Sequence, residues 1–153
     1  MIKVALTGAT GFVGRHVLAE LNTFGIEVVA SVRQLNKQLP EIVNGYWIEM
    51  DVSLPPTHVF EAFGKPDVLI HLAWQGLPNY RSLHHFETEL PMQYAFLQQL
   101  VKQGLKSVVV AGSCFEYGMK SGALSEDIET CPANPNVFAK DTLRNQIQFL
   151  QVI

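Results

Sequence analysis

The chain has 153 residues, of which 48% are hydrophobic and 16% charged, with a net charge of −3. This composition predicts one globular domain, and the acidic balance gives no electrostatic reason to bind nucleic acid or an anionic membrane. No apolar run approaches the roughly 20 residues of a membrane span and no signal peptide is expected, so we predict a cytoplasmic protein. Two cysteines, Cys114 and Cys131, are too few for a disulfide framework.

The first 21 residues predict a buried parallel strand over 3–7, a glycine turn and a helix. Gly8, Gly11 and Gly14 follow a G-x-x-G-x-x-G spacing. In such a turn Gly8 lets the chain leave the strand, Gly11 lets a pyrophosphate approach the backbone, and Gly14 lets the helix pack closely. A tight turn without a ligand is the alternative. The apolar positions of the helix recur at helical spacing and are expected to be buried on the sheet: Phe12, Val13, Val17, Leu18 and Leu21.

Four further apolar runs predict strands, at residues 27–32, 46–50, 67–72 and 107–111. Helices are expected over 57–63, over 89–104 and from about residue 138, and a polar connection or short helix over 34–44. This alternation predicts a Rossmann-like, doubly wound parallel α/β sheet of strand order 3-2-1-4-5 with helices on both faces. A ligand would then bind at the carboxyl ends of the first and fourth strands.

The end of the second strand indicates which dinucleotide is bound. An acidic residue there favours NAD through the ribose hydroxyls, whereas an arginine suits the 2′-phosphate of NADP. The strand ends in Val32-Arg33, without an acid. We therefore expect NADP or NAD as cofactor, with NADP favoured; a solvated arginine at a strand end is the alternative.

Three motifs then arrive in order: T-G-A-T-G-F-V-G at 7–14, H-L-A-W at 71–74 and S-C-F-E-Y-G at 113–118. Together they resemble the extended short-chain dehydrogenase/reductases, the NAD-dependent epimerase/dehydratase family. Within it, three runs are most similar to those of the dTDP-6-deoxy-L-talose 4-dehydrogenases: H-L-A-W-Q-G-L-P-N-Y at 71–80, S-C-F-E-Y-G at 113–118 and F-A-K-D-T-L-R at 138–144. The resemblance implies a nucleotide-sugar substrate, a dTDP-hexose, and hydride transfer at C4 by a reductase or epimerase of polysaccharide biosynthesis. Such chains are about twice as long, so residues 1–153 are expected to be the NAD(P)-binding domain, without the C-terminal substrate-binding part.

The resemblance also implies the site residues. The family needs a tyrosine and a lysine four residues apart on a helix; Lys140 fits the lysine, but Asn136 stands in the tyrosine position. Ser113 matches the hydroxyl that bonds the reacting oxygen, and Cys114-Phe115 replaces the Asp-Glu of dehydratases. The cofactor is expected to contact Gly8, Thr10, Gly11, Phe12, Val13, Gly14, Arg33, Asp51, Val52, Leu72, Ala73, Trp74 and Lys140.

Alternatives remain for several residues. Asp51 is nearly as well explained as a strand-end cap, His71 as a packed strand-end side chain, and Cys114 as an inert buried thiol. His84-His85 has no third ligand at metal spacing, so we expect a solvated helix start and no metal site.

Two helices carry apolar stripes: Met92, Phe96 and Leu100 on one, and Leu143, Ile147 and Leu150 on the other. In the family resembled these helices pair in a dimer, so a homodimer is expected. Because Asn136 cannot carry a proton near neutral pH, two interpretations of function stay open. One is the cofactor-binding half of a reductase or epimerase, and the other is a non-catalytic dinucleotide-binding module.

Overall fold

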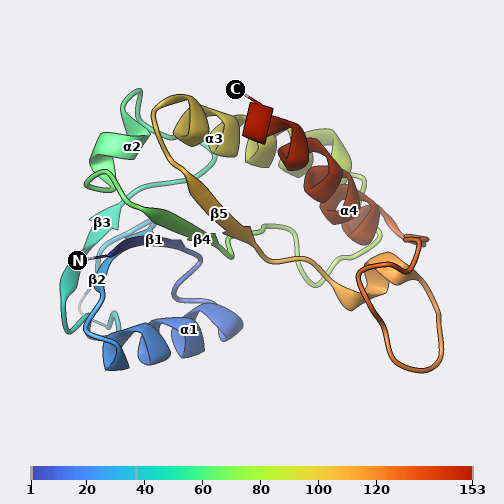
Figure 1. The fold of residues 1–153 in the computed structure, drawn as a ribbon, viewed down its shortest axis with the longest axis horizontal. Coiled ribbons are helices and arrows are strands. Elements are labelled where there is room, and N and C mark those ends of the chain that lie inside the picture. The colour runs from blue at the N-terminus through green and yellow to red at the C-terminus, as the bar shows by residue number, and fades with distance from the viewer. Residues whose placement is uncertain (1, 37, 153) are drawn as a thin grey trace. The chain divides into compact units, whose positions relative to one another are not determined.

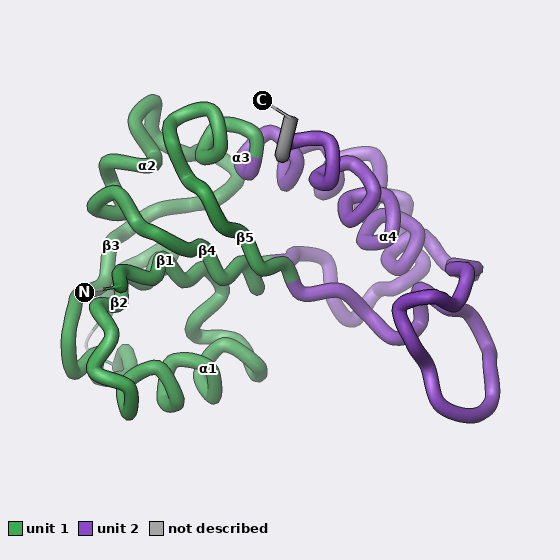
Figure 2. Tube along the Cα trace, viewed as in Figure 1, with its two compact units in different colours: residues 1–73, 98–110 green, residues 74–97, 111–153 purple. Residues whose placement is uncertain are grey.

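The computed structural model describes residues 2–36 and 38–152, and the chain divides into two compact units (Figure 2). Unit 1 contains the residues up to Ala73 together with Gln98–Val110, and unit 2 contains Trp74–Leu97 and the residues from Ala111 on. In the part of the chain that is described, no helix has the length and apolar character needed to cross a membrane.

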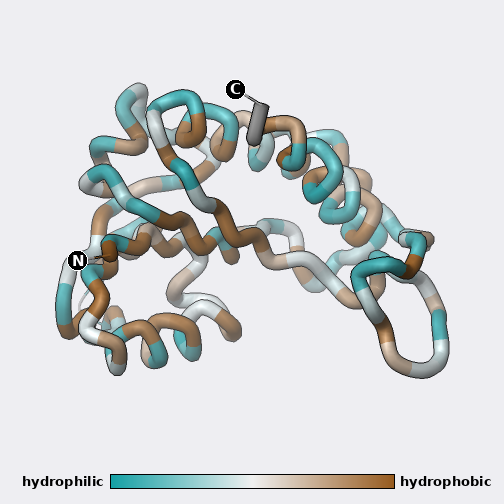
Figure 3. The backbone as a smooth tube through the Cα atoms, in the orientation of Figure 1, coloured by the Kyte–Doolittle hydropathy of each residue, from teal (hydrophilic) through white to brown (hydrophobic). Residues whose placement is uncertain are grey.

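Unit 1 is built on a five-stranded sheet in which every neighbouring pair of strands is parallel (Figure 1). Its spatial order is β3-β2-β1-β4-β5, so the predicted topology is confirmed. The strands are apolar along most of their length (Figure 3), because helices cover both faces of such a sheet. The strand bounds agree with the sequence to within a residue: β1 Lys3–Thr7, β2 Glu27–Val32, β3 Gly45–Glu49, β4 Val68–His71 and β5 Ser107–Val110.

Helix α1 (Phe12–Thr23) lies on one face of this sheet, and α2 (Val59–Ala62) lies on the other (Figure 1). Leu18 of α1 is buried with the sheet residues, as predicted, but Phe12 and Val13 are 75% and 54% exposed. That prediction was wrong because the first turn of α1 starts at the sheet edge where β1 has ended. Helical spacing identifies a face of a helix but not where its partner sheet stops.

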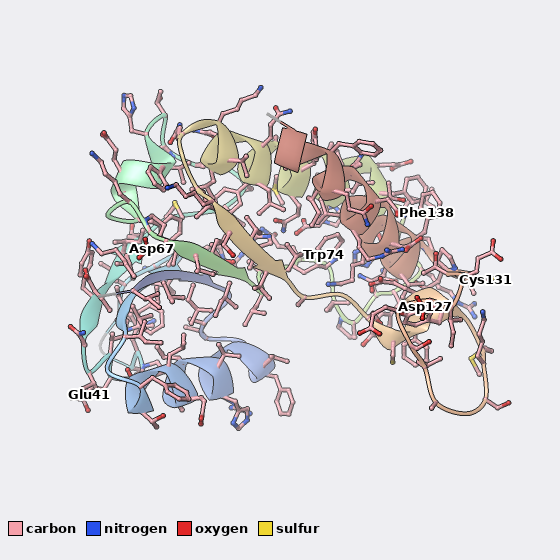
Figure 4. All side chains as sticks on the ribbon, viewed as in Figure 1. Glu41, Asp67, Trp74, Asp127, Cys131 and Phe138 are labelled. Carbon is pink, nitrogen blue, oxygen red and sulfur yellow. The ribbon has the colours of Figure 1, made fainter. Side chains whose placement is uncertain are left out.

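The start of β4 is fixed by a hydrogen bond to the start of β1. Asp67, labelled in Figure 4, comes directly before β4, and its Oδ2 accepts from the backbone N–H of Lys3 at 2.8 Å. This bond aligns the beginnings of β1 and β4. Their carboxyl ends are aligned too, with Thr7 opposite His71.

Unit 2 contains a π-helical turn, η1 (His85–Glu89), and a 3₁₀ turn, η2 (Cys114–Tyr117). The first of these leads into α3 (Leu90–Lys102), whose residues up to Leu97 belong to unit 2 and whose remainder belongs to unit 1. Helix α4 (Pro135–Ile147) packs against both turns and continues into η3 (Gln148–Val152). It begins three residues earlier than expected, because the Asn134 side chain caps it by accepting from the Val137 N–H at 3.2 Å. Proline also suits the first helical position.

The apolar stripes that suggested a dimer are largely covered within the chain. Phe96 and Leu100 of α3 are buried, as are Leu143 of α4 and Leu150, while Met92 and Ile147 are half-buried. They are therefore not exposed stripes in need of a second copy, and a homodimer now rests on the family resemblance alone.

Candidate functional site

The three glycines of the turn after β1 differ in the contacts that an added side chain would make. Gly8 has φ +71°, and a Cβ there would lie 2.7 Å from the Ala73 nitrogen. A Cβ on Gly14 would lie 2.0 Å from the Gly8 carbonyl oxygen. Gly11 has φ −72° and would place its Cβ no closer than 3.2 Å to that oxygen. Gly8 and Gly14 are thus required by the fold, whereas the conformation of Gly11 suits any residue.

The end of α1 beside this turn is open. Thr10, Gly11, Phe12 and Val13 are all exposed, and Gly11 caps the helix without any side-chain hydrogen bond. The first turn of α1 carries no acidic residue. Its backbone N–H groups therefore present an uncompensated positive helix end, which is the feature that binds phosphate in dinucleotide-binding turns.

The ends of β1 and β4 are tied together by side chains. The Thr7 hydroxyl lies 2.7 Å from His71 Nδ1, and its oxygen accepts from the Ala73 N–H at 3.4 Å. His71 is buried, so its predicted role as a packed strand-end side chain is confirmed. These bonds fix the backbone of Leu72 and Ala73 against Gly8.

Arg33 and Asp51 follow β2 and β3 in unit 1. Arg33 is exposed, and Asp51 Oδ1 accepts from the Ser53 N–H at 2.9 Å and from its hydroxyl at 2.7 Å. These two bonds, with a smaller contribution from Arg33, hold the pKa of Asp51 below its ordinary value. Asp51 therefore does act as a cap. The Val52 side chain beside it is buried.

Lys140 and Trp74 lie together in unit 2. The Lys140 ammonium donates to the Ala111 carbonyl at 3.1 Å and lies 4.4 Å from the centre of the Trp74 ring, a cation–π contact. Burial lowers the pKa of Lys140, and the carboxylates of Glu116 and Glu89 partly oppose this shift.

His85 is the clearest departure from the sequence prediction, because its side chain is fully buried rather than solvated. The Trp74 indole N–H donates to His85 Nδ1 at 3.1 Å, and His85 Nε2 lies 2.9 Å from the Asn79 carbonyl. Within residues 2–36 and 38–152, no three His, Cys, Asp or Glu side chains are grouped to hold a metal ion.

Glu89 is a second buried group that sequence analysis missed. Its Oε1 accepts from the Gln75 N–H at 2.9 Å and from the Gln93 side chain at 2.7 Å, which holds the chain after Trp74 against η1. His85 and Glu89 are four residues apart. This helical spacing was the available signal, but the expected helix began too late to include both residues.

Asn136 lies in the first turn of α4 and is only 3% exposed. Its backbone N–H donates to the Tyr80 carbonyl at 3.1 Å, and its side-chain Nδ2 lies 3.4 Å from His85 Nδ1. An amide does not titrate near neutral pH, so the position that holds a tyrosine in the resembled family here has hydrogen-bonding groups and no proton to exchange.

Ser113 caps η2 in a capping box. Its Oγ accepts from the Phe115 N–H at 3.3 Å, and its own N–H donates to Glu116 Oε1 at 2.6 Å. Glu116 is buried, and this burial raises its pKa, although the bond from Ser113 works in the opposite direction. The Ser-x-x-Glu spacing of Ser113 and Glu116 is the sequence signal for this capping box. Cys114 is exposed, contrary to expectation, because η2 turns it outward.

A cavity of about 630 Å³ lies within unit 2 and brings Ser113 and Asn136 to one space. Lys140 and Trp74 are not among the residues that line it. The lining residues come from the segment before η1, from η2 and from the start of α4: Pro78, Asn79, Tyr80, Arg81, Ser113, Phe115, Gly118, Met119, Ala133, Asn134, Asn136 and Val137. The predicted site residues thus form two groups, a glycine turn in unit 1 and a cavity with an adjacent lysine in unit 2.

Comparison with curated proteins supports the expected likeness. Over 144 residues the chain is 28% identical to the dTDP-6-deoxy-L-talose 4-dehydrogenase (NAD(+)) of Aggregatibacter actinomycetemcomitans, covering 94% of this chain and 53% of that protein. It is also 28% identical to the uncharacterized UDP-glucose epimerase YtcB of Bacillus subtilis, over 88% of this chain and 47% of that protein. The chain therefore spans about half the length of the curated relatives it matches.

Solved structures agree with these relatives. MoeE5, in complex with UDP-glucuronic acid and NAD, has a TM-score of 0.75 and 29% identity over 97% of this chain and 49% of its own. A UDP-glucose-4-epimerase from Stenotrophomonas maltophila has a TM-score of 0.80 over 98% of this chain and 48% of its own, but 19% identity, so it supports the fold alone. Residues 4–138, which hold the glycine turn, Ser113 and Asn136, match one family, and by that match this chain belongs to the NAD dependent epimerase/dehydratase family.

Proposed function

We propose that this chain binds a nicotinamide dinucleotide at the turn from Gly8 to Gly14, with the pyrophosphate over the open end of α1. One observation supports this most directly: the backbone conformation of Gly11 does not require a glycine, and an added Cβ would meet only the Gly8 carbonyl oxygen, in a tight contact at 3.2 Å. A residue without a Cβ at that place suits the close approach of a phosphate. MoeE5 was solved with NAD, and the Aggregatibacter enzyme is named for NAD(+).

The proposed cofactor preference is NADP(H) over NAD(H). It rests on Arg33, an exposed cation at the end of β2, the strand next to β1, and on the absence of an acid at that end. A guanidinium can bond the 2′-phosphate with two parallel hydrogen bonds, which a ribose hydroxyl cannot match. Asp51, whose carboxylate already bonds Ser53, is proposed to contact the adenine beside Val52.

Calorimetric titration with both dinucleotides tests this preference. We expect NADP(H) to bind more tightly to the unchanged chain, and Arg33→Ala to reduce that preference. Lys106→Ala is a matched control, because Lys106 is also exposed but precedes β5 on the far side of the sheet order. Tighter binding of NAD(H), or a preference that survives Arg33→Ala, would show that Arg33 does not read the 2′-phosphate.

We further propose that the unit 2 cavity receives a nucleotide sugar, a dTDP-hexose by its relatives, with the Ser113 hydroxyl bonding the oxygen at C4. When bound, the dinucleotide supplies or accepts the hydride at that carbon. Lys140 would hold the nicotinamide ribose, since its ammonium already bonds a backbone carbonyl and can add a hydroxyl partner. In this proposal residues 1–153 act as the NAD(P)-binding domain of a reductase or epimerase.

A second candidate function is favoured by one residue. Asn136 offers no proton, and general acid–base catalysis contributes about 10²–10⁴ in rate. A chain that binds both ligands without turning them over, a non-catalytic binding module, is therefore the alternative. Absorbance of NADPH in the presence of a dTDP-4-keto-6-deoxyhexose distinguishes the two, with Lys140→Ala as the reference for background.

A further inference from the structure

The buried environment of His85 fixes which of its ring nitrogens carries the proton. The Asn79 carbonyl can only accept, so His85 Nε2, at 2.9 Å, must be the donor. The Trp74 indole N–H can only donate, so His85 Nδ1, at 3.1 Å, must be the acceptor. Both partners require the same neutral tautomer, with its lone pair on Nδ1.

This tautomer orients the amide of Asn136. Asn136 Nδ2 lies 3.4 Å from His85 Nδ1 and shares its lone pair with the closer Trp74 indole N–H. The flipped amide would place Oδ1 against that lone pair, which is unfavourable. With Nδ2 directed to His85, Oδ1 is the amide atom left to accept from a ligand, and Asn136 is one of the residues that line the cavity.

Ser113 supplies the complementary group in the same cavity. Its Oγ accepts from the Phe115 N–H at 3.3 Å, which leaves the hydroxyl proton free to donate to a ligand. The cavity thus offers one donor, from Ser113, and one acceptor, from Asn136. A ligand hydroxyl satisfies both, whereas a carbonyl oxygen can only accept and leaves Oδ1 unpaired.

We propose that His85 holds the Asn136 amide so that its Oδ1 accepts a hydrogen bond from the ligand. The cavity would therefore bind a sugar with a hydroxyl next to Ser113 more tightly than one with a carbonyl there. The inference rests on the proposed nucleotide-sugar function and adds which oxidation state of the sugar is bound. A tyrosine in place of Asn136 would favour the opposite state, because a phenol donates to a carbonyl oxygen. His85 acts here as a positioning residue.

The test uses the full 153-residue chain and two probes, measured by saturation-transfer NMR. One is a dTDP-6-deoxyhexose with its 4-hydroxyl, and the other is its 4-deoxy-4-fluoro counterpart, in which the fluorine cannot donate. We expect the fluoro sugar to bind roughly 5- to 150-fold more weakly, the range for a buried polar group left unpaired. His85→Phe should abolish most of this ratio, because it frees the Asn136 amide to turn. His84→Phe should keep it, because His84 pairs with Glu89 and makes no bond to Asn136.

A measurement on the unmodified chain guards against variants that fail to fold. Nitrogen-15 NMR of the imidazole should show His85 protonated at Nε2 only, and the Asn136 amide protons should shift when the 4-hydroxy sugar is added. Equal affinities for the two sugars, no binding of the 4-hydroxy sugar at millimolar concentration, or a proton on Nδ1 would each overturn the inference. Titration of NADP(H) in the same sample reports the proposed cofactor function separately. Loss of dinucleotide binding with retained hydroxyl selectivity would refute that function alone.

Discussion

Two alanine substitutions in the turn after β1 should separate a glycine kept for packing from one kept for a ligand. In Gly14→Ala the new methyl would lie 2.0 Å from the Gly8 carbonyl oxygen, far inside ordinary contact. An extra methyl in a packed site costs about 1–3 kcal/mol, and overlap with backbone belongs at the upper end. Alanine recovers about 1 kcal/mol in helix propensity. We therefore expect a net loss of about 2 kcal/mol in the free energy of unfolding.

Gly11→Ala should behave differently. Its backbone φ of −72° suits alanine, and the methyl would lie 3.2 Å from the Gly8 carbonyl oxygen, a tight contact that needs a shift of only a few tenths of an ångström. Replacing a glycine cap by alanine should cost less than about 1 kcal/mol. The same methyl would push a pyrophosphate away from the N–H groups of α1. Hydrogen bonds to a charged group contribute about 1.5–3 kcal/mol each, so losing one weakens dinucleotide binding roughly 10- to 150-fold.

Urea unfolding of both variants measures the first effect, and calorimetric titration with NADP(H) measures the second. The expected pattern is a stable Gly11→Ala chain that binds poorly and a destabilised Gly14→Ala chain. A Gly11→Ala chain that binds NADP(H) as tightly as the unchanged protein would refute the assignment of this turn to the phosphates. A Gly14→Ala chain of unchanged stability would refute the packing argument.

Three further predictions concern Glu116, Lys140 and Asn136 of unit 2. Because burial raises the pKa of Glu116, its contribution to stability is greatest below the ordinary value of 4.5 and falls as pH rises through the raised value. In urea unfolding, Glu116→Gln should therefore gain stability relative to the unchanged chain over that window, and a constant difference would contradict the shift. Because burial lowers the pKa of Lys140, the stability of the unchanged chain relative to Lys140→Met should rise with pH from the lowered value up to about 10.5, the ordinary one. Finally, this chain should not oxidise NADPH with a dTDP-4-keto-6-deoxyhexose above a Lys140→Ala control; turnover would show that a residue other than Asn136 carries the proton, and Tyr80 is the tyrosine that lines the cavity.

The sheet was predictable because its signals are local. Each strand is a short apolar run, and the parallel order follows from the alternation of strands and helices. The glycine spacing likewise located the turn after β1. The ends of helices and strands were harder to predict, as α4 shows. Asn134 and Pro135 are both helix-start signals, yet the apolar stripe suggested a start near Phe138.

The side-chain contacts of unit 2 could not be predicted from the sequence, for a physical reason. His85 is buried because Trp74 and Asn79, on an irregular segment, supply one donor and one acceptor to its ring. Irregular segments have no periodicity from which such contacts can be inferred. The role proposed for Asn136 depends in turn on that ring, so it could not be predicted from the sequence around residue 136.

The lysine and the tyrosine position of this family are four residues apart, and in this chain they have different direct partners, although Trp74 contacts both Lys140 and His85. Lys140 is held by the Ala111 carbonyl and by the face of Trp74, whereas the Asn136 side chain is held by His85. Exchanging a tyrosine for an asparagine therefore removes the proton carrier without removing any described partner of the lysine. Under the proposed roles, ribose binding by Lys140 and proton transfer at residue 136 are separable. Cofactor binding without turnover is then the expected result for this chain.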